Sequence, residues 1–290
     1  MDLPSSPVIG LLHPGEMGAA VGQCLTGRGL QVLWASDGRS PQTAARAAAA
    51  GLTDVSVPAK VAAQADVILS VCPPHAALDT AWAVHGFGGV YADANAISPD
   101  TAREVAKLIT GSGGRYVDGG IIGPPPVTAS HTRLYLSGEH AGQVSGLFAG
   151  TALEARIAGG SSVAASAVKM AYAAWTKGTA ALLLAARALG QAEGVEDALA
   201  AEWALSQPGL GARSERAAAD ATAKGWRWVA EMEEIAAAMA GAGLPDGFHQ
   251  AAAEIYRRSP RARPGTLAAQ VPPQQRLDAV LAALTGREPG

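Results

Sequence analysis

The sequence contains few charged residues, few aromatic residues and only two cysteines. Charged residues make up 16% and aromatic residues 5% of the 290 positions, and the formal net charge is −3. The lysines and arginines form no basic stripe, which argues against a nucleic-acid partner. Two cysteines, Cys24 and Cys72, are too few for a disulfide framework, so we expect a protein of the reducing cytoplasm.

Long apolar runs without charge are also missing. The most apolar helical stretch, residues 163–189, contains Lys169, Lys177 and Arg187, so we expect no membrane span. The first ten residues lack a basic segment followed by an apolar core, and we expect no signal peptide. The histidines are scattered and the cysteines isolated, so we expect no metal site.

Alanine and glycine are abundant, by contrast, and hydrophobic residues make up 49% of the chain. A chain of 290 residues is long enough for two domains. In the first half, short apolar runs alternate with Ala-rich helical segments, of which residues 43–50 and 99–110 are examples. This alternation is typical of a parallel, doubly wound sheet. The strand candidates are residues 8–12, 30–35, 67–71, 90–94, 116–118 and 134–136.

The pattern changes near residue 160, after which nearly every segment is helical. We therefore predict an α/β protein, in which a Rossmann domain over residues 1–160 is followed by an all-α domain over residues 161–290. The helical domain is expected to bind substrate and to dimerise. Its helix candidates are residues 163–189, 196–206, 213–241, 247–257 and 277–284.

The first strand candidate runs into a Gly-rich turn that opens a helix. Gly15 would let the backbone approach a pyrophosphate, and Gly18 would allow close packing of helix and strand. The helix N-terminus then offers free N–H groups to the anion. His13 stands where the G-x-G-x-x-G fingerprint has its first glycine, so an ordinary βα turn remains the alternative. The residues expected at the cofactor here are His13, Pro14, Gly15, Glu16 and Met17.

The segment after the second strand candidate favours NADP over NAD. Arg39 can form a bidentate pair with a 2′-phosphate, and Ser40 and Thr43 can add hydroxyl donors. Ser36 begins the same segment. Asp37 is the competing signal, because a carboxylate here would hold the ribose 2′-hydroxyl of NAD. Three phosphate-compatible groups against one carboxylate lead us to predict NADP, with NAD as the alternative.

Five segments follow one another in an order found in one enzyme superfamily. Residues 15–18 match G-x-M-G, while residues 93–99 and 118–123 match D-x-S-T-x-x-P and D-x-P-V-S-G. Residues 70–74 take the place of a loop that passes the adenosine ribose and the nicotinamide. Residues 164–169 match the start of a helix that carries a lysine. In this order the chain resembles the 3-hydroxyisobutyrate and 6-phosphogluconate dehydrogenases of the β-hydroxyacid dehydrogenase superfamily.

The resemblance extends over essentially the whole chain. Residues 169–178 and 231–236 resemble a subfamily of phosphogluconate-dehydrogenase-like proteins with a C-terminal domain of unknown function. The resemblance implies that Lys169 is catalytic and that Lys224 reaches toward the cofactor. The further residues expected at the cofactor are Val71, Cys72, Pro73 and Asn95. Those expected at a small-molecule substrate are Asn95, Ile122, Gly123, Lys169 and Tyr172.

Three positions depart from the family pattern. Asn95 replaces a serine of the substrate segment, and residues 122–124, Ile-Gly-Pro, replace Ser-Gly-Gly. Tyr172 and Ala173 replace the asparagines that follow the catalytic lysine. Each departure removes a group that positions a hydroxy-carboxylate in better-known members. The expected substrate class is therefore wider, and includes related carbonyl compounds.

Each candidate residue also has a structural interpretation. Lys169 can exchange a proton with a substrate hydroxyl, or it can lie along a helix edge with its ammonium in water. Tyr172, three residues on, shares a helix face with Lys169 and either donates to substrate or packs in the core. Asn95 offers a donor and an acceptor, or it ends a strand. Lys224 binds a carboxylate or phosphate, or it is a solvated helix lysine.

We predict an NADP-dependent oxidoreductase that transfers a hydride between the nicotinamide and a small hydroxy acid or related carbonyl compound. Lys169 is the expected general acid–base, assisted by Tyr172 and Asn95. The alternatives are an imine reductase-like enzyme and a protein that binds NADP without turnover. A homodimer is expected, because the helical domain is rich in small residues and contains large aromatic groups typical of interfaces. These are Trp175, Trp203, Trp226 and Trp228.

Overall fold

The computed structural model describes residues 3–127, 131–262 and 271–286. The chain divides into two compact units, residues 1–170 and 171–290. Helix α7 (Ala164–Ala192) begins in the first unit and ends in the second. The division falls within α7, later than residue 160, because the first turns of this helix pack on the strand β6 (Arg115–Ile122).

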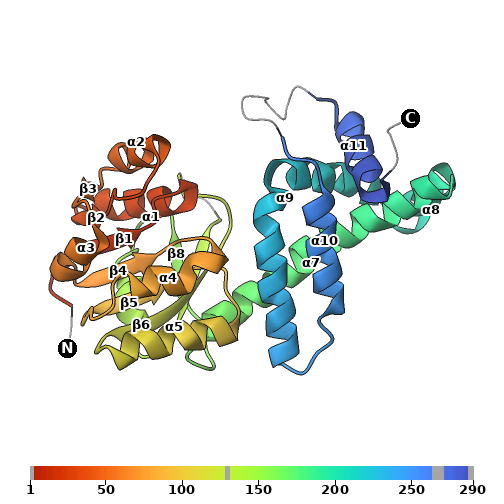
Figure 1. Ribbon diagram of the computed structural model, residues 1–290. Helices are drawn as coiled ribbons and strands as arrows, with labels where there is room; N and C mark the ends of the chain where they lie inside the picture. The colour runs from red at the N-terminus through yellow and green to blue at the C-terminus, as the bar shows by residue number, and fades with distance from the viewer. Residues whose placement is uncertain (1–2, 128–130, 263–270, 287–290) are drawn as a thin grey trace. The chain divides into compact units, whose positions relative to one another are not determined.

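The first unit contains an eight-stranded sheet with the order β3-β2-β1-β4-β5-β6-β7-β8 (Figure 1). Neighbouring strands from β3 to β6 are parallel, and the order reverses direction between β1 and β4, as in a Rossmann fold. The remaining strands are β1 (Ile9–Leu12), β2 (Val32–Trp34), β3 (Thr53–Asp54), β4 (Val67–Ser70), β5 (Val90–Asp93), β7 (Arg133–Ser137) and β8 (Glu154–Ile157).

One pair of strands departs from the predicted parallel arrangement. Strand β7 runs antiparallel to β6, and β8 runs parallel to β7. A parallel crossover needs a connection of a dozen or more residues, usually a helix. No helix occurs in the described residues between β6 and β7, so the chain turns back along the same sheet. The predicted α/β class is confirmed, with a sheet that is mainly parallel.

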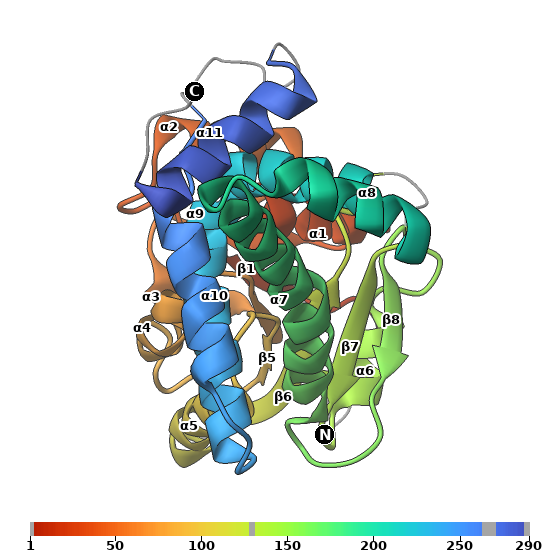
Figure 2. The same cartoon turned by 90° about the vertical axis from the view of Figure 1, so that its right-hand side faces the viewer.

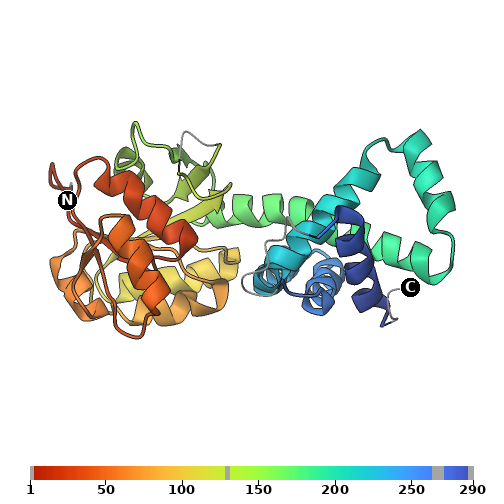
Figure 3. The same cartoon turned by 90° about the horizontal axis from the view of Figure 1, so that it is seen from above.

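Helices cover both faces of this sheet (Figures 1 and 3). Alternate strand residues point to opposite faces, and apolar residues from β1, β4 and β5 pack with α1, α2 and α6 on one face and with α3, α4 and α5 on the other. Ile68 and Tyr91 are fully buried under the second group. The helices are α1 (Glu16–Thr26), α2 (Pro41–Ala49), α3 (Pro58–Gln64), α4 (Ala77–Trp82), α5 (Pro99–Gly111) and α6 (Ala141–Gly146), with a 3₁₀ turn η1 (Pro74–Ala76).

The buried carboxylate of Asp118 ties β6 to β7 and to the start of α7. It accepts hydrogen bonds from the Ser137 hydroxyl at 2.9 Å, and from the backbone N–H and the hydroxyl of Ser166. The backbone approaches closely here, since a Cβ on Gly120 would lie 2.8 Å from the carbonyl oxygen of Ala165. Asp118 therefore fixes the first turns of α7, which carry Lys169, against the sheet.

The second unit is helical, as predicted (Figure 2). Helix α10 packs along α9, and the phenol of Tyr256 donates a hydrogen bond of 2.6 Å to the carbonyl of Lys177 on α7. A search of the described residues finds no helix that is long and apolar enough to cross a membrane. The helices after α7 are α8 (Glu196–Ser206), α9 (Leu210–Gly241), α10 (Gly247–Arg258) and α11 (Pro273–Thr285).

We expect Asp118→Ala to lower the free energy of unfolding of the protein by about 2–4 kcal/mol, because buried donors on Ser137 and Ser166 lose their acceptor. Urea denaturation measures the change. Glu154→Ala is the control, since its carboxylate forms an exposed pair with Arg156 on β8 and should cost no more than about 0.5 kcal/mol. Equal losses for the two variants would contradict this role of Asp118.

Candidate active site

The carboxyl ends of three parallel strands lie at one level of the sheet, beside the middle of a fourth strand, β6. Leu12 of β1 pairs with Ser70 of β4, Ser70 with Asp93 of β5, and Asp93 with Asp118 of β6. The loops that follow β1, β4 and β5 therefore leave the same edge. This edge, at the point where the strand order reverses, is where doubly wound sheets bind their ligands.

The turn after β1 leaves room in front of helix α1. A Cβ on Gly18 would lie 2.4 Å from the carbonyl oxygen of His13, so only glycine allows the helix to approach the turn this closely. A Cβ on Gly15 would meet no heavy atom of the described residues within 4 Å. Gly15 precedes the helix and no described side chain caps it. The start of a helix without a side-chain cap suits a pyrophosphate. The close approach of the helix to the turn at Gly18 is as expected from the sequence, whereas a pyrophosphate at Gly15 stays a prediction.

Arg39, in the loop after β2, reaches the ring of His13. Its two terminal nitrogens lie 2.9 Å from Nδ1 and 3.0 Å from Nε2 of the imidazole. Thr80 Oγ1 on α4 lies 3.4 Å from the same Nε2. Burial, together with the charges of Arg39 and His75, lowers the pKa of His13 to about 4. The ring is therefore neutral at pH 7.

The other residues expected to select NADP lie around the start of α2. Ser40 caps this helix by accepting a 3.2 Å hydrogen bond from the backbone N–H of Thr43, and the two hydroxyls are 3.1 Å apart. Ser36 donates its backbone N–H to Asp54 at the end of β3. Hydrogen bonds from the Ser36 side chain and the Ser56 backbone lower the pKa of this Asp54 carboxyl. Asp54 is a second carboxylate near the end of β2 that the sequence did not reveal.

Asn95 joins the loop after β5 to the loop after β4. Its side-chain oxygen accepts a 2.6 Å hydrogen bond from the backbone N–H of Cys72, and its amide nitrogen donates to Ser70 Oγ at 3.0 Å. Thr80 Oγ1 donates to the Cys72 sulfur. Burial raises the pKa of the Cys72 thiol to about 11, so the thiol stays protonated. Asn95 is only 2% exposed, and its described bonds position the two loops. Val71 and Pro73 flank Cys72 in the first of them.

The buried carboxyl group of Asp93 holds the backbone of Asn95. Asp93 Oδ1 accepts the backbone N–H of Asn95 at 2.9 Å, while Oδ2 has no hydrogen-bond partner among the described residues. Burial, with a smaller contribution from Asp118, raises the pKa of Asp93 to about 7. Near neutral pH the carboxyl group is thus partly protonated, and it can hold the Asn95 turn without a full buried charge.

Lys169 lies against the far end of β6. Its Nζ donates a 2.8 Å hydrogen bond to the carbonyl oxygen of Ile121, three residues beyond Asp118 on the strand, so the ammonium group lies at the carboxyl edge. The side chain of Ile122 is buried, with 4% exposed. Gly123 has a φ of +128°, and a Cβ there would lie 2.7 Å from Thr132 Oγ1. Gly123 therefore serves the backbone turn after β6.

Two predicted site residues belong to the second unit. Tyr172 on α7 is 48% exposed, which argues against the alternative that it packs in the core. Lys224 on α9 forms an exposed pair of 3.2 Å with Asp220. Hydrogen bonds link His13 with Arg39 and Thr80, and Thr80 with the Cys72 loop that Asn95 holds. Thr80 and His75 join the residues expected from the sequence. Lys169 contacts the end of β6 and, among the described residues, forms no hydrogen bond with this group.

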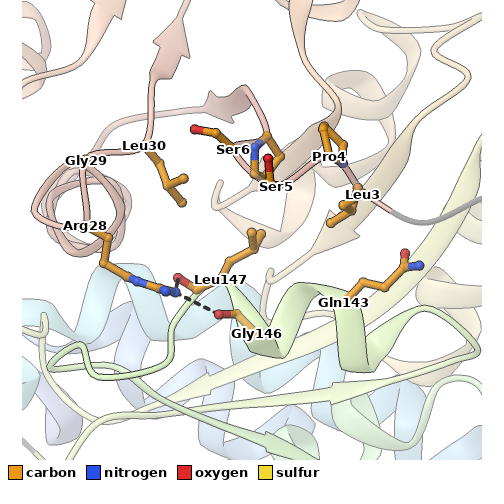
Figure 4. A pocket seen from close by; sticks show the side chains of 11 residues that line it. Leu3, Pro4, Ser5, Ser6, Arg28, Gly29, Leu30, Gln143, Gly146 and Leu147 are labelled. Atoms are coloured by element: carbon orange, nitrogen blue, oxygen red, sulfur yellow. Dashed lines mark hydrogen bonds between the residues drawn. The ribbon is translucent and has the colours of Figure 1, made fainter.

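A hollow of about 450 Å³ lies elsewhere on the first unit (Figure 4). Residues 3–7 and 28–30, which precede β1 and β2, line it, so it lies at the amino ends of these strands. Arg28 donates to the carbonyl oxygens of Gly146 and Leu147 at the end of α6 and is thereby occupied. The described residues contain no group of three or more acidic, His or Cys side chains suited to a metal. The chemistry-bearing groups are therefore those of the carboxyl edge.

Two family models match the chain. Residues 8–142 match the NAD binding domain of 6-phosphogluconate dehydrogenase, and residues 191–259 match a domain of unknown function, DUF1932. The first match includes the strands β1 to β7 and with them the whole carboxyl edge. The second lies within the helical unit. Both confirm the resemblance described above. No curated protein matches the chain.

Solved structures share the fold over most of the chain. A conserved hypothetical protein from Sinorhizobium meliloti 1021 is 23% identical, with a TM-score of 0.70 over 96% of this chain and 97% of that one. A 3-hydroxyisobutyrate dehydrogenase from Mycobacterium tuberculosis is 19% identical, with a TM-score of 0.66 over 87% and 93%. A reductive aminase from Aspergillus terreus, in complex with NADPH and ethyl levulinate, is 21% identical, with a TM-score of 0.56 over 88% and 93%.

We expect Gly18→Ala to lower the free energy of unfolding by about 1–3 kcal/mol, because its Cβ would collide with a backbone oxygen that cannot move without distorting the turn. Gly15→Ala is the matched control, since its Cβ enters open space and its φ of −68° is accessible to alanine. Chemical denaturation followed by circular dichroism measures both. If the two substitutions cost the same, the close approach at Gly18 does not constrain the turn.

Proposed function

We propose that the chain is an NAD(P)-dependent oxidoreductase of the β-hydroxyacid dehydrogenase family, which its matches to the NAD binding domain of 6-phosphogluconate dehydrogenase and to DUF1932 support, and that it transfers a hydride between NADP and a small hydroxy acid or related carbonyl compound. Lys169 is the general acid–base of this proposal. The observation that carries it is the position of the Lys169 Nζ, which the carbonyl oxygen of Ile121 holds at the carboxyl edge of the sheet. Asp118 fixes the helix that presents it.

The residues of the carboxyl edge fit a dinucleotide. The open space at Gly15 and the uncapped start of α1 would receive the pyrophosphate, beside His13, Pro14, Glu16 and Met17. The loop of Val71, Cys72 and Pro73, held by Asn95, would border the ribose and nicotinamide. When bound, NADPH would supply the hydride that the reduction of a carbonyl group requires, and NADP would accept it in the reverse direction.

The task left to the protein is proton transfer to the reacting oxygen. A lysine ammonium has three N–H donors, and the contact with Ile121 uses one of them. The other two can donate to a substrate oxygen, stabilise the negative charge that builds on it, and release a proton to it. In the reverse direction the neutral amine accepts the proton of the hydroxyl group.

The substrate would lie next to Lys169. We propose that Asn95, Ile122 and Gly123 border it through the loop after β5 and the end of β6. Ile122 and Gly123 can offer only backbone groups, since the Ile122 side chain is buried. A substrate recognised in this way is small, with a carbonyl or hydroxyl group as its main polar feature.

An imine reductase-like activity is the second candidate. The observation that favours it is Tyr172, whose side chain is 48% exposed on the helix that carries Lys169. A phenol can donate to a substrate nitrogen as well as to an oxygen. The reductive aminase from Aspergillus terreus has a related fold. Saturating the protein with NADPH and screening keto acids, aldehydes and cyclic imines for loss of nicotinamide absorbance separates the two candidates. No turnover with any of them would contradict both.

The roles of the two residues on α7 can be separated by substitution. Lys169→Met keeps the length and apolar packing of the side chain but removes the charge, and we expect it to lower kcat by about 10²-fold or more. Binding of NADPH should change little, since the Lys169 ammonium contacts the end of β6 rather than the α1 turn. Tyr172→Phe is the matched comparison and should cost clearly less. A near-normal kcat for Lys169→Met with a large loss for Tyr172→Phe would instead support the imine reductase.

The choice of NADP rests on Arg39, with Ser40 and Thr43 at the start of α2. We expect NADPH to bind more tightly than NADH, and Arg39→Ala to remove most of the difference, because a guanidinium contributes charge-assisted hydrogen bonds to a 2′-phosphate. Calorimetric titration measures the four affinities. Arg46→Ala, on the same helix, is the control for the loss of one positive charge. Equal binding of NADH and NADPH by the unmodified protein would contradict the choice of NADP, and tighter binding of NADH would support Asp37 or Asp54 as the group that selects NAD.

We propose that the chain forms a homodimer through exposed apolar groups of the helical unit. Trp175 is 68% exposed, Leu189 64% and Leu205 81%. Helix α8, which carries Leu205, contributes no buried residue in the described chain. Exposed apolar groups of this size are typical of an interface, and a second copy of the chain is the proposed occupant.

Light scattering at micromolar concentration should therefore give twice the mass of one chain. Leu205→Glu should shift the protein toward the monomer, because burying a charge in an interface is costly. Trp82→Glu, at a residue of the first unit that is 58% exposed, is the control and should leave the mass unchanged. A monomeric unmodified protein would rule out the homodimer.

A further inference from the structure

His13 has a backbone conformation that L-amino acids seldom adopt, although asparagine, aspartate and histidine adopt it more often than the others. Its φ is +65°, and Ser56 is the only other described residue besides glycine with a positive φ. Glycine, which the dinucleotide fingerprint has at this position, would meet the same backbone requirement without strain. A histidine at this point in the turn therefore calls for a role of its side chain.

The side chain of His13 is positioned by Arg39 and Thr80. The guanidinium of Arg39 faces both ring nitrogens, at 2.9 and 3.0 Å, and Thr80 Oγ1 is 3.4 Å from Nε2. These groups come from three different elements: the turn after β1, the loop after β2 and helix α4. His13 and Arg39 thus form a hydrogen-bonded pair that joins the predicted pyrophosphate turn to the predicted 2′-phosphate site.

We propose that His13 and Arg39 act together as a phosphate sensor, in which a bound phosphate draws Arg39 away from the ring and His13 takes up one proton. The inference rests on the proposed binding of NADP. Without phosphate, the neutral ring accepts a hydrogen bond from the guanidinium. With phosphate, the guanidinium N–H groups turn to the phosphate oxygens, and the ring gains a proton from solvent and donates the resulting N–H to the anion.

The direction of the pH dependence follows from the groups that face the ring. Burial, the charge of Arg39 and the charge of His75 on η1 all lower the pKa of His13, to about 4. Thr80 on α4 and the protonated Cys72 thiol beyond it add no charge. An anion beside the ring raises the pKa. Proton uptake therefore occurs between pH 4 and the higher pKa of the bound state, and affinity strengthens as pH falls through this window.

The phosphate can be either of two groups of the same cofactor. Arg39 follows β2, where a 2′-phosphate would lie, whereas His13 belongs to the turn that would receive the pyrophosphate. NADPH and NADH separate them, since only NADPH carries the 2′-phosphate. Proton uptake with NADPH alone assigns the sensor to the 2′-phosphate, and uptake with both assigns it to the pyrophosphate.

Titration calorimetry in two buffers of different ionisation enthalpy, at pH 6, 7 and 8, counts the protons taken up. His13→Asn is the comparison variant, because asparagine tolerates a positive φ and does not titrate. The variant also corrects for protons bound by the phosphate itself. We expect the unmodified protein to take up more protons than the variant. The ratio of its affinity for NADPH to that of the variant should rise at least about threefold from pH 8 to pH 6. The upper limit, for the uptake of one whole proton, is about tenfold per pH unit.

Equal proton uptake by the two proteins, with NADPH bound to both, would overturn the sensor and leave the proposed function intact. Failure of both cofactors to bind would overturn the proposed function and the sensor with it. If His13→Asn does not fold, His13→Gly restores the fingerprint residue and serves in its place. An independent readout is the imidazole proton resonance of His13, which should titrate at a higher pH with NADPH bound than without it.

Discussion

The common register of four parallel strands is the constraint on which the candidate site depends. Leu12, Ser70 and Asp93 end their strands at one level, with Asp118 of β6 beside them, so the loops that follow β1, β4 and β5 meet at one edge. If one strand slipped by a single residue, each of its side chains would turn to the opposite face of the sheet and meet different helices. The apolar residues on both faces of β1, β4 and β5 prevent this, because they pack under helices on both sides. Packing of the core therefore determines where the chemistry-bearing groups lie.

Hydrogen bonds of buried polar groups then hold the loops and the start of α7 in place at this edge. Asn95 fastens one loop to the next, and Asp118 fastens the start of α7 to the sheet. Each takes part in several hydrogen bonds in a region with little water, where an unsatisfied partner would be costly. The same rigidity holds Lys169 beside Ile121. The position of the proposed acid–base group is thus a consequence of two buried side chains that need not touch the substrate.

The repeating features could be predicted from the sequence, whereas the contacts between distant segments could not. Apolar runs and the Gly15 and Gly18 spacing predicted the main strands and the first turn. Strands β3 and β8 and helices α3, α4 and α6 are too short to show a period. Asp54 lies beside the end of β2 because β3 pairs with β2, and the sequence pattern did not predict this pairing. Asn95 was recognised as a site residue, but its amide bonds to Cys72 and Ser70 depend on register.

Hydrogen–deuterium exchange with and without NADPH tests the central claim, that the carboxyl edge of the sheet is the cofactor site. Backbone amides become protected where a ligand orders them or takes their hydrogen bonds. We expect NADPH to protect residues 13–18, 36–43, 71–76 and 94–97, which leave this edge after β1, β2, β4 and β5. Protection confined to residues 3–7 and 143–147, around the hollow at the opposite edge, or no protection at all, would contradict it.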